Sequence, residues 1–515
     1  MLCKQLKNLQ YKGWVMYMSA EEIEFVGRVL DNVHGFIYYT KAEEKIMNTL
    51  LFKRLQSIKQ LSIVNWVFPG SEHTRYIHSL GVMYIADKIA VQLKLSTEER
   101  KIVRLAGLLH DIGHYPLSHV CEFPYKKNLE SFPDDSFCSQ INQGVLSQID
   151  IFGEKENSQY MEQSMGCHHE KIGAHIVCYN EEIRKIVIDE CGDDAPDIIA
   201  DMITGNIERK DTDPLLVQIL HSELDADGID YLMRDAMFSG TSFGAFELDQ
   251  LIGCMEIGKY DGTKILCINS KGIAAADQYL INKFFSYSQV VFNKHIAITE
   301  WMAEQIVNWM QKNSAFFPNK KELEKIVKAE KPQERYIGFT DNFFWASLQS
   351  ILDNPLKNTE PKIIKFFSEK LLSHSELDYV PRSEVKIVSN DMNEIKERLL
   401  NSDTYKRLSN YNTRIALFNE RRMSKQIREE KYEEILNKLI EKGNENPEAE
   451  DSVAEEDLSF LRARRYMECI TIKEGEKLRL LCDDNRSLMR TLYDVHLVLL
   501  RVFDCDVTSG LRYQV

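Results

Sequence analysis

The stretch Ala106-Gly-Leu-Leu-His-Asp-Ile-Gly-His114 decides the fold prediction, because it joins an apolar helical turn to an adjacent His–Asp pair. Apolar residues at Ile102 and Leu105 continue the helical spacing upstream, so a buried helix is expected to end at His110 and Asp111. A His–Asp dipeptide alone is weak evidence, since such pairs arise by chance in many chains of this length. The prediction therefore depends on further partners elsewhere in the sequence.

Two other stretches supply these partners. In Arg75-Tyr-Ile-His-Ser-Leu-Gly81, the i, i+3 spacing puts His78 and a phosphate-binding cation, Arg75, on one helical face. Asp227 adds a second carboxylate. Two neutral imidazoles and two carboxylates suit a borderline divalent cation, which can lower the pKa of a water and polarise a phosphoryl oxygen. The sequence thus predicts a metal-dependent phosphohydrolase, with the ligands His78, His110, Asp111 and Asp227.

The fold class is predicted to be mainly α, because apolar residues recur at helical spacing through most of the chain. Short strands are expected at residues 36–39, 264–269 and 385–388, and an apolar helix is expected to contain Leu492, Val495, Val498 and Leu499. The predicted organisation is an N-terminal segment (1–18), a helical core (19–312), a helical lobe (313–442), an acidic linker (443–457) and a small C-terminal α/β unit (458–515). Residues 121–166 form a polar excursion from the core, either a functional lid or a surface loop.

Composition limits the classes of function. A formal net charge of −15 argues against a protein that mainly coats nucleic acid, although a local basic pocket remains open. The eleven cysteines are scattered, which fits reduced thiols in a cytoplasmic protein. Apolar runs stay shorter than the roughly 20 residues that span a bilayer, so no membrane association is expected.

The motifs resemble those of the HD-domain superfamily of metal-dependent phosphohydrolases, specifically its deoxynucleoside triphosphate triphosphohydrolase branch. The likeness covers residues 31–301 and includes Asp31-Asn-Val-His-Gly35, Phe68-Pro-Gly70, the two motifs quoted above, His169-Glu170 and Asp225-Ala-Asp-Gly-Ile-Asp-Tyr-Leu-Met-Arg-Asp235. It implies an HD helical core with minor β elements and a C-terminal helical or α+β extension. It also implies a nucleotide-like substrate and a homo-oligomer of unspecified size.

The resemblance assigns roles around the metal. The residues expected to line the reacting phosphate are His114, His119, His169 and Glu170. His119 is the favoured proton donor, because an imidazole with a near-neutral pKa suits that task, and Glu122 one turn later would orient it. An alternative is that one histidine holds a second metal. Tyr231 and Asp235 are expected to contact the sugar or phosphates, and Asp230 and Arg234 to form a structural ion pair.

Several positions depart from the triphosphohydrolase pattern. Leu51 replaces a glutamine that reads the sugar 3′-hydroxyl, Gly228 replaces a phosphate-binding lysine or arginine, and Val291 replaces a tyrosine that stacks on the sugar. Lys283 replaces a phosphate-binding arginine, and Glu122 replaces an aspartate. Losing the hydroxyl's partner should weaken sugar discrimination, and lysine should bind phosphate less tightly than a bidentate arginine.

The expected activity is hydrolysis of a nucleotide-like phosphate, with dNTP conversion to deoxynucleoside and triphosphate as its specific form. The alternatives are a phosphodiesterase or nuclease acting on cyclic or single-stranded nucleic acid, and a non-catalytic nucleotide-sensing assembly protein. One divalent metal is expected, with Mn, Fe, Mg, Zn, Ni and Co all open.

Overall fold

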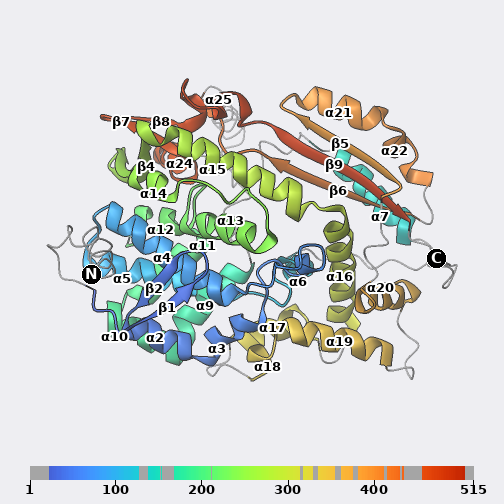
Figure 1. Ribbon diagram of the computed structural model, residues 1–515, viewed down its shortest axis with the longest axis horizontal. Helices are drawn as coiled ribbons and strands as arrows, with labels where there is room; N and C mark the ends of the chain where they lie inside the picture. The colour runs from blue at the N-terminus through green and yellow to red at the C-terminus, as the bar shows by residue number, and fades with distance from the viewer. Residues whose placement is uncertain are drawn as a thin grey trace, which may run out of the picture.

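A computed structural model of the protein describes residues 23–126, 137–150, 152, 168–209, 211–313, 317–328, 334–353, 361–374, 381–410, 414–429, 432–433 and 455–504. The fold is mainly α with small sheets, as predicted (Figure 1). In the parts described, no helix combines the length and apolar character needed to cross a membrane. Seven of the cysteines in these parts are free thiols.

The core is a packed set of helices whose ends carry the predicted motifs. Its first elements are β1 (Gly27–Asp31), β2 (Gly35–Tyr39), α2 (Lys41–Asn48), α3 (Leu50–Lys53), α4 (Arg75–Gln92), α5 (Thr97–Leu109), α6 (His119–Lys126) and α7 (Phe137–Asp150). The next are α9 (His168–Tyr179), α10 (Glu181–Cys191), α11 (Ala195–Thr204), α12 (Pro214–Leu220), α13 (Ala226–Ser239), α14 (Leu248–Gly253), β3 (Met255–Tyr260), β4 (Thr263–Asn269), α15 (Ile273–Ser286) and α16 (Lys294–Asn313).

Local sequence explains where these core helices begin. In α5, Ser96 and Glu99 form a capping box, in which each side chain accepts a hydrogen bond from the other residue's backbone N–H. The Asp225 side chain caps α13 by accepting from the backbone N–H of Gly228 at 2.6 Å. Helix α4 packs against both α5 and α13. The first turn of α4, the end of α5 and the start of α13 therefore come together.

The rest of the chain builds a lobe beside this core. It comprises α17 (Lys320–Val327), α18 (Glu334–Ile337), α19 (Asp341–Asp353), α20 (Lys362–Leu372), β5 (Ser383–Ser389), α21 (Met392–Asn401), α22 (Asp403–Lys406), β6 (Arg414–Arg422), α24 (Glu455–Glu468), β7 (Thr471–Glu474), β8 (Lys477–Leu480), α25 (Met489–Leu492) and β9 (His496–Asp504). The three predicted strands are confirmed as β2, β4 and β5.

Three small sheets connect distant parts of the sequence. Strands β1 and β2 form a hairpin, β3-β4-β7-β8 form a second sheet with β4 and β7 parallel, and β9 lies between β5 and β6 in a third. The last strands of the chain thus join sheets that begin in the core and in the lobe. The boundaries predicted for the domains stay a prediction, and most of the predicted acidic linker lies outside the described residues.

The helix predicted to contain Val498 and Leu499 is wrong. Helix α25 ends at Leu492, and residues 496–504 form strand β9, which is buried on both faces. A continuous apolar run does not distinguish a buried helix from a buried strand, because neither side of it is polar. The neighbouring strands and helices determine the outcome here.

The excursion after His119 reaches the lobe. Its helix α7 packs on β6, where Val145 and Ile149 join a second, smaller core under the β5-β9-β6 sheet (Figure 1). The buried Asn142 amide donates to the Arg414 carbonyl at 3.0 Å and accepts from the Ala416 N–H at 2.9 Å. A segment inserted beside the predicted active site is therefore fixed to the lobe sheet.

Candidate metal centre and active site

Three helix ends bring the four predicted metal ligands together. His78 lies in the first turn of α4, His110 is the residue at which α5 ends, and Asp227 is the second residue of α13. The His78 Nε2 atom lies 2.9 Å from Asp227 Oδ1 and 3.8 Å from Asp111 Oδ2. The His110 Nε2 atom lies 3.5 Å from Asp111 Oδ1 and 3.8 Å from Asp227 Oδ1. Three segments, of which the last lies more than a hundred residues after the others, thus converge on one point.

The donor atoms fit a divalent cation. His110 Nδ1 donates to the Gly107 carbonyl at 2.8 Å, because a carbonyl only accepts, and this leaves the Nε2 lone pair directed inward. That Nε2 atom is buried and has no hydrogen-bond partner. His78, His110 and Asp227 each offer a ligand atom within 4.8 Å of the others. The described residues can therefore hold a metal ion here, with Asp111 adjoining.

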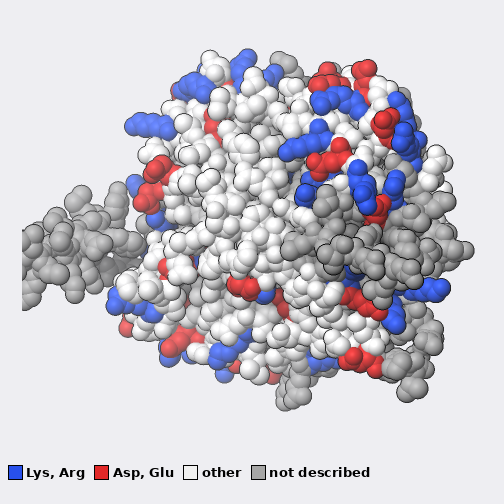
Figure 2. Space-filling view, turned by 45° about the vertical axis from the view of Figure 1, so that its right-hand side comes forward, with Lys and Arg blue, Asp and Glu red and all other residues white. Residues whose placement is uncertain are grey.

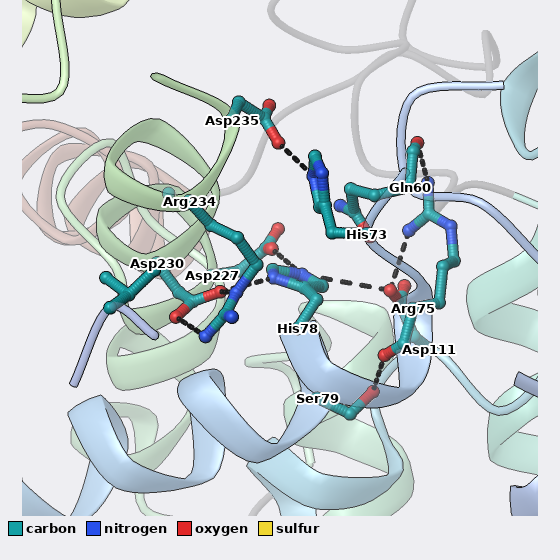
Figure 3. Close-up of polar contacts among 12 residues, drawn as sticks. Gln60, His73, Arg75, His78, Ser79, Asp111, Asp227, Asp230, Arg234 and Asp235 are labelled. Carbon is teal, nitrogen blue, oxygen red and sulfur yellow. Dashed lines mark hydrogen bonds and ion pairs between the residues drawn. The ribbon is translucent and has the colours of Figure 1, made fainter. Parts of the chain in front are cut away.

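A carboxylate beneath His78 orients its ring. The fully buried Asp230 accepts from His78 Nδ1 at 2.7 Å and from Arg234 Nε at 2.8 Å (Figure 3). It also contacts His34 Nε2 at 2.5 Å. The predicted Asp230–Arg234 ion pair is confirmed, and Arg234 also pairs with Asp31 at 2.7 Å. Burial lowers the pKa of His78, but hydrogen bonds to Asp227 and Asp230 raise it overall to about 10.

Arg75 is engaged at the same centre. Its guanidinium donates to Asp111 Oδ2 at 2.6 Å and to Ser118 Oγ at 2.8 Å, and its side chain is buried (Figure 3). Burial opposes ionisation of Asp111, but the charges of Arg75, His110 and His78 hold its pKa well below the usual range. Asp111 is therefore ionised and ready to bind a cation, while contact between Arg75 and a phosphate stays a prediction.

A second group of imidazoles lies beside Asp111. His114, His119 and His169 have ring centroids 4.1 to 5.4 Å apart. Glu122 joins two of them, because Oε2 lies 2.9 Å from His119 Nδ1 and Oε1 lies 2.9 Å from His169 Nδ1. Glu122 thus orients His119 as predicted, and it also holds His169.

Hydrogen bonding separates the roles of these imidazoles. His114 Nδ1 accepts from the Tyr115 backbone N–H at 3.2 Å, so Nε2 carries the proton of the neutral ring. Burial and the charge of Arg75 hold the pKa of His114 well below its usual value. His114 is therefore a neutral donor, a state in which its Nε2 cannot ligate a metal. Burial lowers the pKa of His169, but Glu122 raises it overall.

The remaining predicted site residues lie on α9, α13 and α15. Glu170, predicted to line the reacting phosphate, follows His169 on α9, and Asp235, predicted to bind substrate, contacts His73 Nε2 at 2.8 Å (Figure 3). The Lys283 ammonium lies 5.7 Å from the centroid of the Tyr231 ring, on the side of α13 that carries Asp227. Their contacts with substrate stay predictions.

The structure explains one departure from the triphosphohydrolase pattern. A Cβ atom at position 228 would lie 2.3 Å from the Tyr279 hydroxyl and 3.5 Å from Lys283 Nζ. Glycine fits at position 228 because the Tyr279 hydroxyl and Asp225 Oδ1, which would lie 2.8 Å from the Cβ atom, occupy the space of a side chain. Leu51 is buried in α3, where it packs in the core.

Sequence reasoning missed two features of this centre. His34, at the turn of the β1–β2 hairpin, was quoted in a motif but given no role, and its contact with Asp230 joins residues 196 positions apart. Asp230 was assigned only to an ion pair. The i, i+3 spacing of Asp227 and Asp230 could have indicated that the second carboxylate also faces His78.

Comparison with known proteins agrees with this geometry. The HD domain family profile matches residues 75–235, which include the four predicted ligands. An uncharacterized MG461 homolog of Mycoplasma pneumoniae is 28% identical over 368 residues, covering 68% of this chain and 77% of that protein. Deoxynucleoside triphosphate triphosphohydrolase SAMHD1 of Gallus gallus is 28% identical over 337 residues, covering 62% of this chain and 51% of that protein.

A solved phosphohydrolase structure from Bacteroides thetaiotaomicron has a similar fold, with a TM-score of 0.56 at 19% identity, covering 93% of this chain and 99% of that one. At this identity the likeness concerns the fold alone. The chain thus contains an HD domain over residues 75–235. Among HD-domain proteins, it resembles the deoxynucleoside triphosphate triphosphohydrolase branch.

Proposed function

We propose that this protein is a hydrolase that uses one divalent metal to cleave a nucleotide phosphate, with a dNTP yielding deoxynucleoside and triphosphate as the specific reaction. The observation that carries the proposal is the pair of imidazole groups around Asp111. The Nε2 atoms of one group, His78 and His110, face the carboxylates of Asp111 and Asp227. The other, His119 and His169, is held by a carboxylate that keeps proton carriers in place.

The residues divide the chemistry between them. A cation at His78, His110, Asp111 and Asp227 would supply positive charge that activates a water and polarises the phosphate. His114 donates its Nε2 proton to a non-bridging oxygen, and the charged form of His169 stabilises the negative charge that develops. His119, whose side chain is 65% exposed, protonates the leaving oxygen and exchanges protons with solvent.

The hydrogen bonds of His114 favour one metal over two. A second cation among the three histidines would need a lone pair on His114 Nε2, but the Tyr115 N–H already fixes the proton on that atom. His119 and His169 are the two remaining donors there, and both are held by Glu122. The second imidazole group is therefore better suited to move protons than to hold an ion.

A small-molecule substrate is favoured over a polymer. The chain carries a net charge of −15, and Figure 2 shows acidic and basic side chains interspersed where charges gather on that face. A protein that binds nucleic acid without base contacts depends on concentrated basic charge. These features support a substrate that fits one buried centre.

The test is a screen of NTPs, dNTPs, nucleoside monophosphates and cyclic nucleotides with Mn²⁺ or Mg²⁺, with products separated by chromatography. We expect inorganic triphosphate from a dNTP, and loss of at least about 100-fold in kcat with Asp111→Asn. Release of nucleoside monophosphates instead would indicate a phosphodiesterase. Turnover that survives in folded Asp111→Asn protein would contradict a metal-dependent mechanism at this centre.

A further inference from the structure

A row of cationic and aromatic side chains leads away from Asp227. Lys283 Nζ lies next to Gly228, at 3.5 Å from the position that a Cβ atom would take there, and 5.7 Å from the centroid of the Tyr231 ring. Tyr287 follows Lys283 by four residues, at the start of a π-helical turn, Tyr287–Val291, that ends α15. Such turns re-aim side chains and often occur at functional sites. The row therefore begins at the metal centre and continues along α15.

The lobe sheet supplies the end of this row. The Arg421 guanidinium carbon lies 3.8 Å from the centroid of the Tyr287 ring. Along β6, Arg421 is an even number of positions from Ile415 and Leu417, so the three side chains lie on the same face of the strand. Ile415 and Leu417 are buried in the main core, and Arg421 is therefore on the core-facing side. Close by, Arg501 of β9 donates to the Phe292 carbonyl at 2.6 Å, directly after the π-helical turn. The lobe is thus fixed where Arg421 meets the core.

Within the described part of the chain, neither cation of the row forms a direct ion pair with a carboxylate, although Asp225 acts on Lys283 electrostatically. Arg421 forms no ion pair or hydrogen bond there, and Lys283 Nζ has only long contacts, to the Tyr279 hydroxyl at 3.4 Å and the Glu223 carbonyl at 3.5 Å. Burial and the charge of Arg421 lower the pKa of Lys283, but Tyr279 and Asp225 raise it by more. The pKa of Lys283 is therefore raised overall, and its side chain stays charged. Two cations within electrostatic reach of each other favour a bound anion.

The stacked arrangement leaves Arg421 able to bind that anion. A guanidinium that stacks on an aromatic ring uses its flat face, so the N–H groups on its edge remain available to a phosphate. Lys283 contributes a point charge on the side nearer the metal centre. An anion that contacts both would extend from the HD core to the lobe sheet.

We propose that Arg421, positioned by Tyr287 and acting with Lys283, forms a phosphate subsite that the lobe sheet contributes to the active site. Its ligand is the phosphate groups beyond the reacting one, so the subsite rests on the proposed hydrolysis of a nucleotide polyphosphate. This gives the lobe a direct part in substrate binding. It also offers a replacement for the phosphate-binding side chain that is missing at Gly228.

Binding of inorganic tripolyphosphate to the full-length protein in EDTA tests the subsite without metal or catalysis. By isothermal titration calorimetry, we expect Arg421→Ala to weaken binding about 10-fold or more, and Arg421→Lys to weaken it less. The matched control is Arg414→Ala, at the other end of the same strand on the opposite face, which should bind as the wild type does. Unchanged affinity in Arg421→Ala, or no binding by the wild type, would overturn the proposal.

Two further measurements distinguish loss of the subsite from misfolding and from failure of the proposed function. If Arg421→Ala does not fold, Arg421→Gln retains a long polar side chain, and unchanged tripolyphosphate affinity in that variant overturns the subsite. With an active substrate, we expect Arg421→Ala to raise KM with little change in kcat. If tripolyphosphate binding depends on Arg421 but no nucleotide is hydrolysed, the subsite stands and the proposed function fails.

Discussion

Asp230 should control metal affinity although it is not a predicted ligand. Its fully buried carboxylate contacts His34 at 2.5 Å, His78 at 2.7 Å and Arg234 at 2.8 Å. Asp230→Asn keeps the shape but replaces one accepting oxygen with an NH₂ group. If that group takes the Oδ2 position, it faces His78 Nδ1, which must then accept, so that the ring proton moves to the Nε2 atom that faces the metal centre, and it also opposes the Arg234 Nε donor. If it takes the Oδ1 position, it faces His34 Nε2 and opposes the Arg234 Nη2 donor.

The Oδ2 orientation weakens the metal centre. Losing the partner of a ligating histidine reduces metal affinity by about 10- to 100-fold, which corresponds to about 1.4 to 2.8 kcal/mol. The metal-free protein should also lose about 1 to 3 kcal/mol in its free energy of unfolding, because a buried donor loses its acceptor. Stabilisation by added metal should shrink in proportion to the affinity.

The assay is calorimetric titration of EDTA-treated protein with Mn²⁺, together with thermal unfolding in the presence and absence of the metal. Asp235→Asn is the matched control, because Asp235 lies on the same helix and contacts His73, which is not a predicted ligand. Folded Asp230→Asn protein that binds Mn²⁺ within twofold of the wild type would refute the reasoning.

Three further predictions concern other contacts. In Glu122→Gln, His169 loses the carboxylate that raises its pKa, so the ring loses its proton at lower pH. The basic limb of the kcat/KM–pH profile should therefore shift to lower pH, and a limb at the wild-type pH would contradict this. Gly228→Ala should lower the free energy of unfolding by about 1 to 3 kcal/mol, and Tyr279→Phe should recover part of that loss in a double-mutant cycle. Asn142→Ala should cost about 1 to 3 kcal/mol and speed amide exchange in β6, which hydrogen-exchange mass spectrometry measures.

Sequence reasoning predicted the candidate metal centre because the ends of helices carry its expected ligands. The end of the apolar pattern at Leu109 placed His110 and Asp111 at the end of α5, as the structure has them. The contacts that orient these ligands could not be predicted from the sequence. The distance of 2.5 Å between His34 and Asp230 depends on how a hairpin packs against α13, and no local pattern encodes that packing.

The lobe shows a similar limit in the fold. The predicted strand at residues 385–388 was confirmed, because turn residues and alternation mark it locally. The predicted helix containing Val498 and Leu499 was wrong, because β9 is covered on both sides by elements distant in sequence. Arg421 was likewise given no role, since its meeting with Tyr287 requires the sheet to dock on the core.

The departures from the triphosphohydrolase pattern are physically connected. Taken singly, Gly228 and Lys283 suggest a loss of phosphate binding, because one cation is missing and another is weaker. In the structure, a Cβ atom at position 228 would lie 2.3 Å from the Tyr279 hydroxyl and 2.8 Å from Asp225 Oδ1, so any longer side chain there would collide with these two groups. A lysine or arginine introduced at position 228 should therefore destabilise the protein unless Tyr279 is also replaced by a smaller residue. The departures at positions 228 and 283 are therefore neighbours in space, because Lys283 Nζ lies 3.5 Å from the position that a Cβ atom of residue 228 would take.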